Sequence, residues 1–144
     1  MTKKKKILIL NGPNLNLLGR RKTAIYGKVP FSDFLKREIL PNFKNTDIHA
    51  FQSNSEGEII DKIHEFGFDC DGIVLNAGAY THTSIAIADA IEAVETRVFE
   101  VHISNIYARE QYRRKSYISE HAVATICGCG LQGYIFAIDY LLNK

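Results

Sequence analysis

A fivefold alternation between short β-rich apolar runs and helix-like segments sets the fold class of this chain. The expected strands span residues 7–10, 47–52, 72–75, 97–103 and 122–127. The expected helices span residues 32–40, 56–66, 84–94, 108–114 and 131–142. Ser32 and Ser84 can cap two of these helices, and Pro41 helps to end the first. Strands joined by such crossovers must run parallel to one another.

Five consecutive strand–helix units predict a flavodoxin-like α/β fold in one domain that covers residues 1–144. Right-handed crossovers place helices on both faces of the sheet, which gives a three-layer sandwich. We expect a five-stranded parallel sheet in the order 2-1-3-4-5, in which strands 1, 3 and 4 are neighbours. Residues 15–29 show no helix or strand period and contain Gly19 and Gly27. This segment is expected to be a loop, with a mobile active-site lid at about residues 19–27.

The composition and charge of the chain argue against several classes of protein. Of its 144 residues, 46% are hydrophobic and 24% are charged, as in ordinary globular proteins. The net charge of +2 is too small to indicate a nucleic-acid partner. No apolar run is long enough for a signal peptide or a membrane span. Cys70, Cys127 and Cys129 form no C-x-x-C pair and favour a reducing compartment. From these three observations together, we expect a cytoplasmic protein with no membrane or nucleic-acid partner.

Polar and ionisable side chains follow three of the expected strands at the point where each strand ends. They are Asn11 and Asn14 after the first strand, Asn76, Thr81, His82 and Thr83 after the third, and Glu100, His102, Ser104, Asn105 and Arg109 along and after the fourth. These three strands are adjacent in the expected order. Ligands of open parallel sheets bind beyond the carboxyl ends of the strands at such a switch point. The sequence therefore predicts one polar crevice at this edge of the sheet.

Glu100 and His102 form a candidate acid–base pair, because residues two apart on a strand project from the same face. A carboxylate in this position can orient an imidazole and fix its tautomer, as a general acid or base requires. The alternative is a structural pair in the core or at the sheet edge. The polar residues at the neighbouring strand ends favour the acid–base interpretation.

Arginines gather in two short stretches, and guanidinium groups bind carboxylates and phosphates through paired N–H donors. Five of the seven arginines are Arg20, Arg21, Arg109, Arg113 and Arg114. Arg109 and Arg113 are four residues apart and would share one face of the expected helix. In the loop, nearby guanidinium charge would favour the phenolate form of Tyr26 and make it a candidate base. The alternatives are solvated surface arginines and a tyrosine that anchors the loop.

Familiar cofactor and metal motifs are absent from the sequence. There is no G-x-G-x-x-G, Walker, H-E-x-x-H or G-x-S-x-G pattern. His82 and His102 could in principle ligate a metal ion, but their asparagine and arginine neighbours make a poor ligand shell. A phosphoacceptor or flavin-binding module would need acidic residues or a phosphate loop after the first strand, where Asn-Gly-Pro-Asn stands. We therefore expect an enzyme that needs no metal and no cofactor and holds a small anionic substrate.

Several sequence blocks together resemble the type II 3-dehydroquinate dehydratases. The blocks are N-G-P-N-L-N-L-L-G-R-R at 11–21, Y-G at 26–27, Q-S-N-S-E-G at 52–57, N-A-G-A-Y-T-H-T-S at 76–84, E-V-H-I-S-N at 100–105, R-E-Q-Y-R-R at 109–114, S-Y at 116–117 and Q-G-Y at 132–134. They are collinear over nearly the whole chain. Departures from the family pattern are small: Tyr107 stands where many relatives have histidine, and Cys127 and Cys129 replace other small or apolar residues.

The resemblance implies a reaction and an assembly. The reaction is the dehydration of 3-dehydroquinate to 3-dehydroshikimate, by anti elimination through an enolate and without a cofactor. It would serve the shikimate pathway or, alternatively, quinate catabolism. The resemblance also implies a flavodoxin-like fold and a homododecamer built as a tetramer of trimers.

The resemblance further implies roles for individual residues. Tyr26 would be the base, Arg21 would hold it as phenolate, and Asn14 would help to bind the water that stabilises the enolate oxygen. His102, oriented by Glu100, would protonate the departing hydroxyl. Asn76 and the backbone amides of Ile103 and Ser104 would bind the substrate's carboxylate, and His82 and Arg113 would bind its ring hydroxyls. Arg109 would support the lid or the charge balance, and Asp89 would reach a neighbouring subunit's site.

Overall fold

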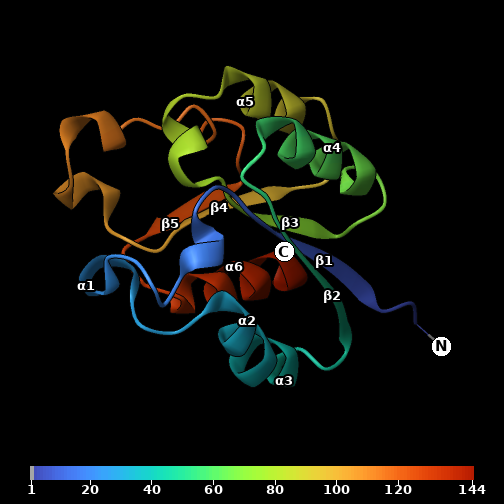
Figure 1. Cartoon of the computed structure of the whole chain (residues 1–144). Helices are drawn as coiled ribbons and strands as arrows, with labels where there is room; N and C mark the ends of the chain where they lie inside the picture. The colour runs from blue at the N-terminus through green and yellow to red at the C-terminus, as the bar shows by residue number, and fades with distance from the viewer. Residues whose placement is uncertain (1) are drawn as a thin grey trace.

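The computed structural model describes residues 2–144 and has one parallel sheet at its centre (Figure 1). Five strands pair in the order β2-β1-β3-β4-β5. Their bounds are β1 Lys5–Asn11, β2 Thr46–Gln52, β3 Gly72–Asn76, β4 Val98–His102 and β5 Ala124–Cys127. Every adjacent pair is parallel. The predicted strand order and fold class are confirmed.

Helices cover both faces of the sheet, which makes three layers (Figure 1). One face packs against α4 (Glu56–Phe66) and α5 (Ile85–Glu92). The other packs against α6 (Gln132–Asn143) and a helical segment made of α2 (Phe31–Phe34), the π-helix η2 (Leu35–Ile39) and α3 (Leu40–Asn42).

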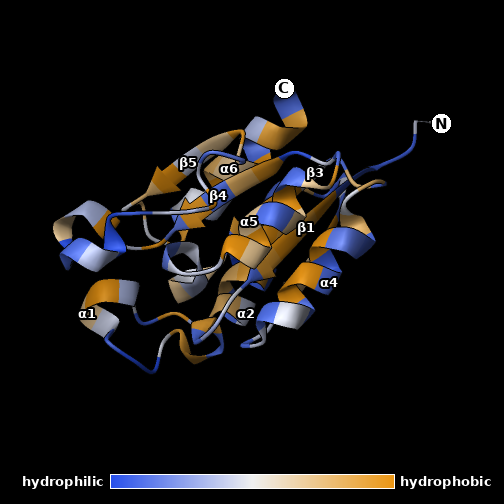
Figure 2. Cartoon of the chain, turned by 90° about the horizontal axis from the view of Figure 1, so that it is seen from above, coloured by the Kyte–Doolittle hydropathy of each residue, from blue (hydrophilic) through white to orange (hydrophobic). Residues whose placement is uncertain are grey.

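Strand β1 shows how the sequence supplies both cores. Ile7 and Ile9 point to the α6 side, whereas Leu8 and Leu10 point to the side of α4 and α5. All four side chains are at most 1% exposed, because alternate residues of a central strand face opposite layers. Figure 2 shows the same pattern as apolar strands lying between the helices.

Two helical predictions need correction at their starts and ends. Ser84 caps α5 as predicted, since its Oγ accepts a hydrogen bond from Ile87 N at 2.9 Å. The first helix begins at Phe31, after Pro30, so Ser32 is not its cap. It also continues past Pro41 to Asn42. Proline lacks the N–H that a regular helical turn uses as a donor. The turn before Pro41 is a π-helix, which is wider than a regular α-helix, and the chain continues from it into α3.

The predicted helix at 108–114 is wrong. Two short 3₁₀ turns stand there instead, η4 (Ile106–Ala108) and η5 (Gln111–Arg113). The side chain of Asn105 caps η4 by accepting from Tyr107 N at 3.1 Å, and Arg109 adopts extended backbone angles. A seven-residue segment is too short to hold a helix by propensity alone, so local capping decides its shape.

The segment 15–29 contains two short turns, η1 (Leu15–Leu17) and α1 (Thr23–Tyr26). Gly27 ends α1 with a φ of 86°, a value that glycine adopts without strain. Turn α1 lies at the same end of the molecule as η4 and η5, beyond the carboxyl ends of the strands (Figure 1). The mobility of this lid remains a prediction.

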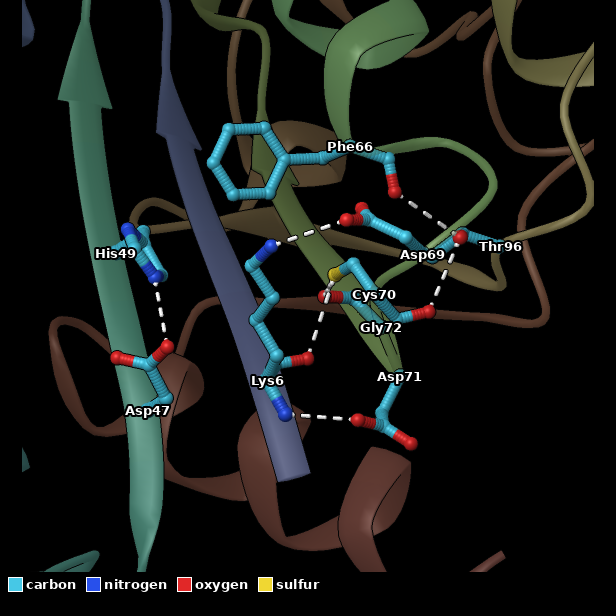
Figure 3. A network of polar contacts seen from close by, with 9 residues as sticks. All are labelled: Lys6, Asp47, His49, Phe66, Asp69, Cys70, Asp71, Gly72 and Thr96. Carbon is cyan, nitrogen blue, oxygen red and sulfur yellow. Dashed lines mark hydrogen bonds and ion pairs between the residues drawn. The ribbon is translucent and has the colours of Figure 1, made fainter. Parts of the chain in front are cut away.

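The amino ends of the strands are fixed by a separate polar network (Figure 3). Lys6 N donates to Asp71 Oδ2 at 2.7 Å, and Lys6 Nζ lies 3.2 Å from Asp69 Oδ2. Thr96 Oγ1 donates to the carbonyl oxygens of Phe66 and Cys70 at 3.2 and 3.1 Å. These contacts join the turns before β3 and β4 to β1 at the end of the sheet opposite to the predicted crevice.

At the carboxyl end, the turns after β1 and β3 touch through their backbones. Gly12 N donates to Asn76 O at 2.7 Å. A Cβ atom at position 12 would lie 2.4 Å from Ala77 O, far inside the distance that any side chain tolerates. Only glycine permits this approach, and it fixes the two rims from which Asn14 and Asn76 project.

Candidate active site

A pocket opens beyond the carboxyl ends of β1, β3 and β4, where the sequence predicts a crevice. Of the predicted site residues, those that line it are Asn14, Arg21, Tyr26, Asn76, His82, His102, Ile103, Ser104, Arg109 and Arg113. Pro13, Leu15, Leu18, Gly78, Ala79 and Ile106 complete the lining. Glu100 and Asp89 are not part of the lining: Glu100 lies buried beneath it, and Asp89 is exposed on α5.

His102 and Glu100 form a buried pair beneath the pocket. The His102 side chain is 6% exposed and Glu100 is fully buried. Their closest atoms, His102 Nε2 and Glu100 Oε1, are 3.1 Å apart. Within residues 2–144, Nε2 has no hydrogen-bond partner of regular geometry. The two groups therefore interact as neighbouring charges when His102 is protonated.

The Glu100 carboxylate accepts hydrogen bonds from four hydroxyl groups, of which the sequence analysis singled out only that of Thr81 as a polar residue at a strand end. The donors are Thr81 at 2.7 Å and Ser116 to Oε1, and Thr125 at 2.9 Å and Ser119 to Oε2. Burial by itself raises the pKa of Glu100. The adjacent His102 and the hydroxyls of Ser116 and Ser119 lower it by more than this, so the pKa of Glu100 falls to about 2. Glu100 is therefore an anion at neutral pH despite its burial.

Tyr26 lies between two guanidinium groups. Arg109 Nη1 donates to the phenolic oxygen of Tyr26 at 2.7 Å. The guanidinium carbon of Arg21 lies 4.9 Å from the centre of the Tyr26 ring, and that of Arg109 lies 5.4 Å from it. The resemblance gives Arg21 the role of holding Tyr26 as phenolate, and this role stays a prediction; in the structure the hydrogen bond to the phenolic oxygen comes from Arg109. Arg109 therefore contacts the phenolic oxygen directly, and Arg21 contacts the ring.

The amide of Asn76 is held by a residue for which sequence reasoning gave no role. Asn76 Nδ2 donates to Tyr134 Oη at 2.8 Å, and Tyr134 Oη donates to Asn11 Oδ1 at 2.7 Å. Gly78 N donates to Asn76 Oδ1 at 3.2 Å. Burial raises the pKa of Tyr134 well above its usual range, so its hydroxyl stays protonated. The NH₂ group of Asn76 has a second hydrogen, which remains available to a ligand.

His82 presents a hydrogen-bond acceptor to the pocket. Its Nδ1 lies 2.7 Å from the carbonyl oxygen of Lys115, which can only accept, so Nδ1 carries the hydrogen. Burial lowers the pKa of His82. The hydrogen bond to the Lys115 carbonyl raises it, but the nearby His102 and Arg113 lower it again, and the net shift is downward. The neutral ring therefore keeps Nε2 as an acceptor.

The charge of the pocket lining is positive. Arg21, Arg109 and Arg113 line it, and its lining residues include neither an aspartate, a glutamate nor a lysine. Within residues 2–144, no three His, Cys, Asp or Glu side chains are grouped so as to hold a metal ion. No helix in the same part of the chain is long and apolar enough to cross a membrane.

The fold and the pocket together define a flavodoxin-like α/β protein whose pocket is lined by a tyrosine, two histidines and three arginines. The family model for Dehydroquinase class II matches residues 5–142. The chain therefore belongs to the class II dehydroquinase family.

Individual relatives agree with this family over nearly their whole length. A 3-dehydroquinate dehydratase of Clostridium botulinum (strain Okra / Type B1) is 51% identical over 140 residues, which cover 96% of this chain and 95% of the relative. A catabolic 3-dehydroquinase of Verticillium alfalfae is 50% identical over 136 residues, which cover 94% and 91%. The crystal structure of the type II dehydroquinase of Butyrivibrio crossotus superposes with a TM-score of 0.92 at 47% identity, covering 96% of this chain and 98% of that one.

Proposed function

We propose that this chain dehydrates 3-dehydroquinate to 3-dehydroshikimate by an anti elimination through an enolate. The observation that carries the proposal is the meeting, in one arginine-lined pocket, of Tyr26 bonded to Arg109 and His102 beside Glu100. One group can take a proton while the other gives one, and the arginines suit a substrate that carries a carboxylate.

The first step assigned to these residues is proton removal. Tyr26, as phenolate, takes the proton from the carbon alpha to the ketone, and the bonding electrons form an enolate on the ketone oxygen. Arg109 and Arg21 stabilise the phenolate before this transfer. Asn14, at the rim of β1, helps to bind the water that stabilises the enolate oxygen.

The second step completes the elimination. The enolate electrons return to form the carbon–carbon double bond, and the carbon–oxygen bond to the leaving hydroxyl breaks. His102 protonates this hydroxyl, which leaves as water. The carboxylate of Glu100 lies 3.1 Å from Nε2 of this imidazole and can orient the ring for the transfer.

The remaining lining residues hold the substrate. The free hydrogen of Asn76 Nδ2 and the backbone amides of Ile103 and Ser104 bind its carboxylate. The rim at Ile103 and Ser104 is supported from β5, because Gly130 N donates to Ile103 O at 3.0 Å and Gly128 N donates to Ser104 O at 3.0 Å. His82 Nε2 accepts from a ring hydroxyl, and Arg113 donates to another.

The biological setting is inferred from the names of the relatives. We assign the reaction to the shikimate pathway in the cytoplasm, with quinate catabolism as the alternative, since relatives of both names match the chain. The single domain, with its lid at about 19–27, would assemble as a homododecamer, a tetramer of trimers. Asp89 would reach a neighbouring subunit's site, which agrees with its exposed place on α5 outside its own pocket.

The proposed activity is tested by adding 3-dehydroquinate to the pure protein and recording the ultraviolet absorption of the conjugated enone carboxylate. Turnover is expected to continue in EDTA. It is also expected after incubation with substrate and borohydride followed by gel filtration, because no lysine lines the pocket to form a Schiff base. Absence of turnover from a folded and fully assembled protein would contradict the proposed reaction, and inactivation by either reagent would contradict its mechanism.

Replacement of Tyr134 by phenylalanine tests how Asn76 is held. Without the Tyr134 hydroxyl, the Asn76 amide loses its partner on the side away from the ligand. We expect KM to rise about three- to tenfold with kcat changed less, as for the loss of one neutral hydrogen bond. Steady-state kinetics at one pH measures both constants. A fall in kcat with unchanged KM would show that Tyr134 does not act through substrate binding.

A further inference from the structure

Four hydroxyl groups surround the buried carboxylate of Glu100, and we name Thr81, Ser116, Ser119 and Thr125 the hydroxyl cage. We propose that the cage residues are positioning residues for His102. They keep Glu100 as an anion whose acceptor sites are already filled, so that Glu100 acts on His102 through its charge and does not take its proton. The part of this proposal that concerns proton transfer rests on the proposed function.

The cage supplies enough donors to satisfy the carboxylate. A carboxylate offers about four lone-pair sites, two on each oxygen. Oε1 receives Thr81 and Ser116, and Oε2 receives Ser119 and Thr125. The donors come from three parts of the fold: η3 (Gly78–His82), the segment 114–123 and strand β5, where Thr125 is the direct neighbour of Glu100 in the register.

The filled acceptor sites explain the geometry at His102. Nε2 stands 3.1 Å from Oε1 yet makes no hydrogen bond to it. Each carboxylate oxygen already accepts from two hydroxyl groups, which accounts for about four acceptor sites. Glu100 therefore acts on His102 as a buried charge, with Oε1 3.1 Å from Nε2.

Without the cage, burial would remove this charge. A fully buried carboxylate without donors prefers its neutral form. The titratable groups that face Glu100 are His102 on its own strand and His82 on η3, and the groups from the segment 114–123 and from β5 are neutral hydroxyls. Loss of hydroxyls would raise the pKa of Glu100, so its charge, and its effect on His102, would be lost as the pH falls.

The two donors to Oε2 are the best positions for a test. The hydroxyl oxygens of Thr81 and Ser116 contact Oε1 and also lie 2.7 Å from each other. These two hydroxyls have only two hydrogens for the three contacts, so the remaining one can reorient when its partner is removed. We therefore choose Ser119→Ala and Thr125→Val, singly and together. Thr96→Val is the matched control, since it removes a threonine hydroxyl at the opposite end of the sheet (Figure 3).

The first measurement is the pH dependence of kcat and KM between about pH 4.5 and pH 8.5. For the double variant, we expect kcat relative to the unmodified enzyme to fall about tenfold or more near pH 5. The ratio should return to within about twofold near pH 8, where Glu100 is ionised again, with KM nearly unchanged. The Thr96→Val ratio should not depend on pH. A ratio for the double variant that is the same at every pH would overturn the proposal, because general structural damage is not repaired by raising the pH.

The second measurement reads the charge of Glu100 without reference to catalysis. Infrared spectra of protein labelled with carbon-13 at glutamate carboxyls are recorded against pH, and the Glu100 band is assigned by its absence in Glu100→Gln. We expect its titration midpoint to rise by about four pH units in the double variant, which is the rise that a tenfold loss of charge near pH 5 requires, and by less in each single variant. An unchanged midpoint in a folded single or double variant would refute the cage while leaving the dehydratase activity intact. Conversely, an inactive unmodified protein would refute the proposed function, and the infrared titration would still decide whether the cage holds the charge.

Discussion

Tyr26→Phe is expected to lower kcat by about 10²- to 10⁴-fold, the usual contribution of a positioned proton-transfer group. The variant keeps the ring that faces Arg21 and removes only the oxygen that Arg109 contacts at 2.7 Å. KM should change by no more than about threefold, because the Tyr26 hydroxyl is assigned to the transition state and not to ground-state binding. Stopped and continuous assays of enone formation give both constants.

Tyr107→Phe is the matched control for this experiment. Tyr107 is 59% exposed on η4 and is not part of the pocket lining, so its loss of a hydroxyl should leave both constants unchanged. If Tyr26→Phe retained near-normal kcat, Tyr26 could not be the base. The two guanidinium groups around it would then serve to close the lid and not to hold a phenolate.

His102→Gln is expected to reduce kcat by a similar factor of about 10²- to 10⁴-fold. The change removes the group assigned to protonate the leaving hydroxyl and leaves a side chain that can still hydrogen-bond. The ring of His82 lies parallel to that of His102 at 6.4 Å, but its proton is committed to the carbonyl of Lys115, so it cannot replace His102. Circular dichroism and the assembled molecular mass establish that the variant is folded.

The control for His102→Gln is the same replacement at His49. His49 pairs with Asp47 at 3.0 Å on strand β2, away from the pocket lining, and its replacement should not affect kcat (Figure 3). Retention of activity by His102→Gln would remove His102 from the acid role. It would also remove the catalytic meaning of the charge on Glu100.

The fold was predictable because its determinants are local. Each strand is a short apolar run, and each crossover has a helical period or a cap such as Ser84, so the chain order leads to the sheet order. The helix predicted at 108–114 was wrong because the Asn105 cap and the extended Arg109 outweigh a weak helical pattern. Pro41 was misjudged as a helix end because the preceding π-helical turn was not visible in the sequence.

The site was predictable where it depends on strand ends and less so where it depends on loops. Asn76, His102 and Ser104 line the pocket as the strand boundaries indicated. The contact of Arg109 with Tyr26 joins residues 83 positions apart and requires the placement of the lid on η4. The hydroxyls of Ser119 and Thr125 lie 19 and 25 positions from Glu100 in segments with no motif of their own, so only the folded chain brings them together.

The contact between Gly12 and Ala77 shows which position must stay unchanged when the pocket is redesigned for another substrate. A side chain at position 12 would meet Ala77 O at 2.4 Å and force the first and third strand ends apart, and the asparagines on both rims would move with them. Ala79 lines the same pocket but is exposed at its mouth. A combinatorial library should therefore keep Gly12 and vary Ala79. Larger side chains at position 79 can select among substrates without moving the rims that carry Asn14 and Asn76.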